Sequence, residues 1–125
     1  MDELKEYLGH FDLTGFKRGN RTEGTKFLTA RVIDFARKYG FSYQTEISLG
    51  LKRPTSDRRG YLDFVLEKDN KKFAIEVDSS NKKWSLQKLL HAHTLGYRPI
   101  WIRWCIPVRI SVPSDVYLID LTNKA

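Results

Sequence analysis

Residues 59–78 read RGYLDFVLEKDNKKFAIEVD, and this stretch decides the fold. Two runs rich in β-branched and aromatic residues flank a short polar turn, a pattern that predicts a β-hairpin. With residues 69–70 as a two-residue turn, Asp63 faces Glu76 directly across the two strands. Because side chains alternate along a strand, Asp78 lies on the same face as Glu76. Three carboxylates are therefore expected together at one end of the hairpin.

The carboxylates of Asp63 and Glu76 suggest a site for a divalent cation. Directly opposed side chains in an antiparallel pair have Cβ atoms about 4.5–5.5 Å apart, and like charges there repel each other. Mg²⁺ or Mn²⁺ would remove this repulsion, and Mg²⁺ usually binds one or two carboxylates together with substrate phosphate. The alternative is that both acids are solvated on an exposed sheet face. The hairpin's other face is apolar, with Leu62, Phe64, Leu66, Phe73, Ile75 and Val77.

Length and composition point to one small globular domain with a polyanionic partner. The chain has 125 residues, which is typical of a single domain spanning residues 1–125. Lys and Arg number 22 against 15 Asp and Glu, and this net charge of +7 favours nucleic acid as the partner. The only cysteine, Cys105, excludes an internal disulfide and is typical of a reducing compartment. No signal peptide or bilayer-spanning run is recognisable, so we expect a soluble cytoplasmic protein without a membrane partner.

Periodicity elsewhere predicts an α/β domain with a mixed central sheet flanked by helices. Apolar residues near a 3.6-residue period predict a short helix within residues 1–14 and a longer one at 22–39, which Gly40 ends. Residues 79–81 are good N-cap residues for a further helix at 82–95. Strands are expected at residues 41–49, 99–104 and 115–121, in addition to the hairpin. The strand at 99–104 follows the helix closely enough to lie parallel to the second hairpin strand.

Two basic clusters lie next to the expected elements. One precedes the long helix and consists of Lys17, Arg18 and Arg21; the other leads into the hairpin and consists of Lys52, Arg53, Arg58 and Arg59. Both clusters are candidates for contacts with a phosphate backbone. For the first cluster a solvated loop is an equally good explanation, and for the second it is the default one.

The arrangement of acids resembles that of the PD-(D/E)XK restriction-endonuclease-like nuclease superfamily. Its αβββαβ core has an acid on the second strand, here Asp63, and a Glu-x-Lys-type triad on the third, here Glu76-Val77-Asp78. Residues 22–104 follow that layout. The segments AIEVDSSNK (74–82) and LGYRPIWIRW (95–104) are most similar to small nucleases related to very-short-patch repair endonucleases. The likeness to archaeal Holliday-junction resolvases is looser.

The resemblance implies a metal-dependent nuclease. Asp63 and Glu76 would be Mg²⁺ or Mn²⁺ ligands. Asp78 is a candidate catalytic carboxylate that could join them, and Glu23 on the first long helix is a candidate third ligand. Asp78 stands where the family usually has its catalytic lysine, so another residue must supply a cation. Helical phase favours Lys82 as this catalytic cation, whereas similarity to a basic residue in the relatives favours Lys88, which is otherwise a nucleic-acid contact.

Three functions are compatible with these features. The first is a DNA endonuclease, suited to structure-selective nicking or junction cleavage, which would act as a homodimer to cut both strands. The second is a non-catalytic nucleic-acid-binding protein that keeps the nuclease fold, as the Asp78 substitution suggests. The third is a phage or mobile-element interaction factor, for which Trp84, Trp101 and Trp104 would offer exposed aromatic surface, although core packing is the simpler explanation of these residues. The sequence does not distinguish DNA from RNA as substrate.

Overall fold

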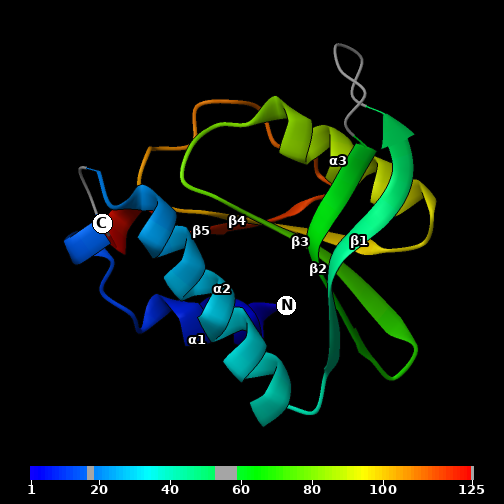
Figure 1. Ribbon diagram of the computed structural model, residues 1–125, viewed down its shortest axis with the longest axis horizontal. Coiled ribbons are helices and arrows are strands. Elements are labelled where there is room, and N and C mark those ends of the chain that lie inside the picture. The colour runs from blue at the N-terminus through cyan, green and yellow to red at the C-terminus, as the bar shows by residue number, and fades with distance from the viewer. Residues whose placement is uncertain (17–18, 53–58, 125) are drawn as a thin grey trace.

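The computed structural model describes residues 1–16, 19–52 and 59–124, and the side chains of these residues except 51, 52 and 59. Its helices and strands follow the order α1, α2, β1, β2, β3, α3, β4, β5 (Figure 1). Their bounds are α1 Asp2–Gly9, α2 Arg21–Lys38, β1 Ser42–Lys52, β2 Arg59–Lys68, β3 Lys71–Asp78, α3 Lys83–Thr94, β4 Arg98–Arg103 and β5 Tyr117–Asp120. Short 3₁₀ turns lie at Thr14–Phe16 and Thr122–Lys124.

The strands form one five-stranded mixed sheet in the order β1-β2-β3-β4-β5. The β1–β2 and β2–β3 pairs are antiparallel, whereas β3–β4 and β4–β5 are parallel. Helix α3 makes the crossover between β3 and β4, which a parallel pair requires. The α/β class, the mixed sheet and the flanking helices are confirmed. Among the described residues, no helix is long and apolar enough to span a membrane.

The hairpin has the expected register and turn. Phe64 pairs with Ile75, and Lys68 pairs with Lys71 on either side of the turn. Both central turn residues have positive φ, 53° at Asp69 and 64° at Asn70. Such left-handed pairs form the two-residue turns whose twist matches that of the flanking strands, and Asn and Asp tolerate this conformation best after Gly.

Two hydrophobic clusters cover the two faces of the sheet. On one face, α1 and α2 contribute buried residues such as Leu4, Leu28 and Phe35, which pack with Phe64 and Ile75. On the other face, α3 packs its buried residues against the sheet: Leu86, Leu89 and Ala92 with Val65, Ala74 and Trp101. The sheet is therefore enclosed on both sides between helices, as Figure 1 shows.

The expectation for Leu62 was wrong, whereas core packing of two of the tryptophans is confirmed. Leu62 was expected on the same face as Phe64, but it packs in the cluster with α3. The β2–β3 ladder ends at Phe64, so beyond this residue β2 no longer follows the face that the hairpin register defines. Trp101 and Trp104 are fully buried, so they present no aromatic surface to a partner.

The first turn of α2 is fixed against the carboxyl ends of β3 and β4 by Trp104. The backbone N–H of Trp104 donates to the Asp78 carbonyl oxygen (3.1 Å), and its indole Nε1–H donates to Thr25 Oγ1 (3.1 Å). The indole ring lies so close to Gly24 that a Cβ there would be 2.2 Å from Trp104 Cη2. Helix α2 therefore needs glycine at this position, although glycine is a poor residue in a helix interior.

We expect Gly24→Ala to lower the free energy of unfolding by about 1–3 kcal/mol, because the added methyl group overlaps a buried ring that cannot move away. Helix propensity alone predicts the opposite sign, a gain of up to about 1 kcal/mol. Gly9→Ala in α1, where a Cβ meets nothing within 4 Å, is the control and should not destabilise the protein. Urea denaturation of both variants measures the effect. A Gly24→Ala protein as stable as wild type would contradict the close packing.

Candidate functional site

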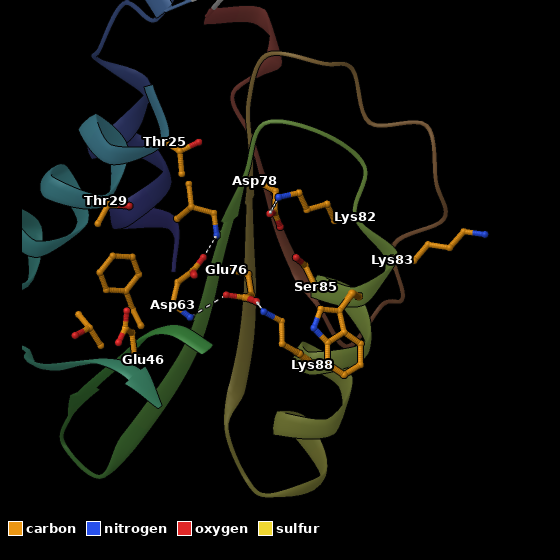
Figure 2. Close-up of a pocket in the computed structure, with 14 residues that line it drawn as sticks. Thr25, Thr29, Glu46, Asp63, Glu76, Asp78, Lys82, Lys83, Ser85 and Lys88 are labelled. Carbon is orange, nitrogen blue, oxygen red and sulfur yellow. Dashed lines mark hydrogen bonds and ion pairs between the residues drawn. The ribbon is translucent and has the colours of Figure 1, made fainter. Parts of the chain in front are cut away.

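The candidate site lies where β2 and β3 separate. The ladder of backbone hydrogen bonds between them ends at the Phe64–Ile75 pair. Beyond this pair, hydrogen bonds from backbone N–H groups to carboxylate side chains link the two strands. The backbone N–H of Asp63 donates to Glu76 Oε2 (2.9 Å), and the backbone N–H of Val77 donates to Asp63 Oδ2 (2.9 Å). Figure 2 shows these two bonds between the diverging strands. Asp63 and Glu76 therefore face each other as predicted, and each carboxylate uses one oxygen to hold the other strand.

Glu76 is almost fully buried, with 1% of its side chain exposed, and it lies beside Lys88. The Lys88 ammonium forms an ion pair with Glu76 Oε1 and also donates to the Tyr61 carbonyl oxygen (2.9 Å). Burial raises the pKa of Glu76 to about 8; the charge of Asp63 acts in the same direction, and Lys88 opposes both. Glu76 Oε1 lies within ion-pair distance of Lys88, yet it is a buried oxygen without a well-directed hydrogen bond. A cation that binds this oxygen has to share it with Lys88.

Asp78 lies close by but is held differently. Its Oδ2 accepts a hydrogen bond from the buried Trp101 Nε1–H (2.8 Å), and its Oδ1 lies 3.7 Å from Lys82 Nζ. The Asp78 carbonyl oxygen accepts from Arg103 Nη1 (3.2 Å) as well as from Trp104. Asp78 is therefore fixed at the carboxyl end of β3, with only Oδ1 directed toward a cation.

A cavity of about 760 Å³ contains the side chains of Asp63, Glu76 and Asp78. Thr25 and Thr29 of α2 line one side of it, and Ser85 and Lys88 of α3 line the other (Figure 2). The cleft is thus open between the two helices that cover opposite faces of the sheet, because the separation of β2 from β3 interrupts the sheet at this point. A cavity of this size and polarity can admit a phosphodiester group.

Glu46 on β1 also lines this cavity, and sequence reasoning missed it. Its neighbours Thr45 and Ile47 pair with Phe64 and Leu62, so Glu46 lies across from Asp63. Its φ of 54° is unusual for a residue other than glycine and shows that the strand is locally distorted. The sequence did carry a signal for Glu46: it is an acid within a strand of alternating polar and apolar residues, and this strand comes just before the one that carries Asp63.

Lys82 is the N-cap residue of α3, which begins at Lys83, so helical phase does not orient its side chain, and its catalytic role stays a prediction. Lys82 has extended backbone angles (φ −100°, ψ 106°) and precedes the helix. Its side chain lines the cavity but is 62% exposed and reaches Asp78, not Glu76. Lys88, with 12% of its side chain exposed, is the cation in contact with the central carboxylate.

Glu23 is not brought to the site. Its side chain is 64% exposed and pairs with Lys26 (3.4 Å) one turn along the same helix. Thr25 and Thr29 face the cavity instead, and Glu23 does not line it. The expectation of Glu23 as a third metal ligand is therefore wrong.

The basic clusters are described only in part. Arg21 begins α2 and is exposed near the site. Lys17, Arg18, Arg53 and Arg58 lie outside the described residues, as do the side chains of Lys52 and Arg59. Their expected contacts with nucleic acid remain predictions.

The described residues fit a cation held by two carboxylates better than one held by three. Within residues 1–16, 19–52 and 59–124, no group of three His, Cys, Asp or Glu side chains is arranged to hold a metal ion. Asp63 and Glu76 are linked as a pair: Glu76 accepts a hydrogen bond from the backbone N–H of Asp63, and Asp63 accepts one from the backbone N–H of Val77. Mg²⁺ often takes only one or two carboxylates and completes its shell with water and substrate phosphate.

Comparison with known proteins supports the fold only. No protein-family model and no curated protein matches the chain. A crystal structure of a protein of unknown function, AF1548, is similar to 75% of this chain, with a TM-score of 0.50 and 15% sequence identity. This chain covers 56% of that chain's length. The likeness shows a shared α/β arrangement and carries no statement about activity.

In the absence of divalent cations, we expect the free energy of unfolding to fall as the pH rises from about 4.5 to about 8. Folded Glu76 has a pKa of about 8 against an ordinary value of 4.5, so over this range unfolding releases a proton and is favoured by rising pH. Each unit of pKa difference corresponds to about 1.4 kcal/mol. Urea denaturation at several pH values in EDTA measures the slope.

Glu76→Gln should flatten this pH dependence, whereas Glu67→Gln on the same hairpin should keep the wild-type slope. If Glu76→Gln showed the wild-type slope as well, the buried carboxyl group would not be the source of the effect.

Proposed function

We propose that the chain is a metal-dependent endonuclease with a restriction-endonuclease-like core, which hydrolyses phosphodiester bonds in DNA. The observation that carries this proposal is the pair Asp63 and Glu76, locked face to face in a cleft that also contains a buried lysine. The order of elements from α2 to β4 supports it, since it is αβββαβ. The net charge of +7 fits a polyanionic substrate.

Asp63 and Glu76 would hold Mg²⁺ or Mn²⁺. When bound, such an ion polarises the phosphodiester and lowers the pKa of an attacking water. Glu76 would offer its buried Oε1, and Asp63 would offer Oδ1, since Oδ2 is bonded to Val77. The backbone bonds fix both side chains before any ligand arrives, which reduces the cost of ordering them on binding.

Lys88 is the cation that we assign to the chemical step. Its ammonium is anchored by Glu76 and the Tyr61 carbonyl, and it is largely shielded from solvent. A positive charge held in this way stabilises negative charge that develops on the phosphate. Lys88 thus supplies the positive charge that the family's usual lysine would supply at the position of Asp78. Asp78 itself would position Lys82 at the edge of the cavity.

Nucleic acid would approach along the basic residues around the cleft. Lys82 and Lys83 line the cavity, and Arg21 lies at the start of α2. Lys17, Arg18, Lys52, Arg53, Arg58 and Arg59 would extend this contact to the backbone without reading sequence. A homodimer with two sites would be needed to cut both strands of a duplex.

A second candidate is a nucleic-acid-binding protein that does not cut. The observation that favours it is the ion pair of Lys88 with Glu76, which neutralises the central carboxylate without a metal ion. In that case Glu76 and Lys88 would stabilise the fold of the cleft only, and DNA would bind to the basic rim.

Asp63→Asn and Glu76→Gln should each abolish cleavage of plasmid and branched DNA in Mg²⁺ or Mn²⁺, because each removes a carboxylate charge from the proposed metal site. Glu23→Gln removes an exposed carboxylate outside the cavity and should cleave at the wild-type rate. Gel analysis of the products measures the activity. Wild-type protein that binds DNA but never cuts it would favour the second candidate.

Lys88→Met should reduce the cleavage rate by about 100-fold, as the loss of one well-placed charge in an active site typically does. Lys82→Met should have a much smaller effect, because Lys82 is exposed and contacts Asp78 rather than Glu76. Single-turnover kinetics on the same DNA compare the two variants. A larger loss in Lys82→Met would contradict the assignment of Lys88.

A further inference from the structure

A second cavity of about 390 Å³ adjoins the carboxylate cavity. It lies between the first turn of α2 and the connection from β3 to α3, and its cationic side chains are Arg21, Lys26 and Lys82. Four hydroxyl side chains complete its polar lining, among them Thr25. The two cavities share Thr25, Asp78 and Lys82, so a ligand chain can pass from one into the other.

Charge is divided between the two cavities. The first is lined by four carboxylates and three lysines, whereas the second has three cations and one acid, Asp78. Asp78 offsets the positive charge of the second cavity only in part, because its Oδ2 accepts a hydrogen bond from the Trp101 indole and its Oδ1 is 3.7 Å from Lys82 Nζ. Lys26 pairs with Glu23 at 3.4 Å, but both side chains are exposed, and such surface pairs contribute little. Lys26 is therefore available to an anion.

The walls of the second cavity are held in place from inside the protein. Thr25 Oγ1 accepts the Trp104 indole N–H, which leaves the hydroxyl hydrogen of Thr25 to donate to a ligand. On the other wall, the buried Arg103 guanidinium donates to the Asp78 carbonyl oxygen and to Asn81 Oδ1 (3.1 Å), which fixes the connection from β3 to α3. A site with fixed walls binds its ligand with less loss of conformational freedom.

We propose that this second cavity binds a backbone phosphate that neighbours the one placed at Asp63 and Glu76, on the same nucleic-acid strand. The inference deepens the proposed function and rests on it for the identity of the ligand. Three cations and four hydroxyl side chains line this cavity, and among its lining residues only Val77 is apolar; such a lining fits a phosphate group rather than a base. Because the two cavities share lining residues, one nucleic-acid strand could lie in both, from the carboxylates of Asp63 and Glu76 to the start of α2.

The test compares two double variants of the full chain, each lacking two positive charges. Arg21→Gln with Lys26→Gln removes cations of the second cavity. Lys38→Gln with Lys72→Gln removes exposed cations that line neither cavity and is the matched control. Fluorescence anisotropy with a labelled DNA oligonucleotide in EDTA, over a range of KCl concentrations, gives the affinity and its salt dependence without any cleavage.

The slope of log K against log salt should become less steep by about 0.7–0.9 in the cavity variant, which corresponds to one lost phosphate contact on single-stranded or duplex DNA. The control variant should keep the wild-type slope. An unchanged slope in the cavity variant, or an equal change in the control, would overturn the proposal.

Two further outcomes separate the source of the phosphate and the underlying function. If inorganic phosphate protects the wild type against heat more than the cavity variant, while the DNA slope is the same in both, the site takes free phosphate and the proposal fails. If the slope changes as expected in a protein that never cuts DNA, the phosphate site is upheld and the nuclease proposal fails. If the protein cuts DNA and the slope is unchanged, the nuclease proposal stands and the phosphate site fails.

Discussion

Two hydrogen bonds between side chain and backbone determine how this sheet opens. Asp63 N–H donates to Glu76, and Val77 N–H donates to Asp63, each at 2.9 Å. Without these bonds, separating β2 from β3 would leave two partly buried backbone N–H groups without a partner in the protein, which is costly. With these two hydrogen bonds, β2 and β3 can separate while their backbone N–H groups still have partners. The cleft, its access from both helix layers and the position of both carboxylates all follow from this arrangement.

The arrangement places a carboxylate where it is costly to ionise. Glu76 is buried, and its pKa is raised to about 8. Lys88 on α3 offsets part of this cost, because its ammonium is largely shielded from solvent and lies against Glu76 Oε1. Strongly perturbed groups in a cleft are typical of functional sites, although structural ion pairs also produce them. The raised pKa, the buried lysine and the facing Asp63 together make a purely structural role the less economical explanation.

Much of the fold could be predicted because its signals are local. The turn at Asp69-Asn70 fixed the hairpin register, and that register placed Asp63 opposite Glu76. What failed depended on single backbone angles or on packing between distant elements. Lys82 has an extended conformation just before α3, so its side chain is not placed by the helical phase that applies from Lys83 onward. The position of Glu23 depends on how α2 packs against Trp104, which no local pattern encodes.

Diffraction from crystals grown with Mn²⁺, at a wavelength where manganese scatters anomalously, tests the central claim most directly. We expect an anomalous peak between the carboxylates of Asp63 and Glu76, with the hydrogen bond from Val77 N–H to Asp63 intact. The peak should be absent from crystals of Asp63→Asn grown in the same way. A wild-type structure without Mn²⁺ at this position, in which Lys88 keeps its ion pair with Glu76, would show that the two carboxylates do not form a metal site.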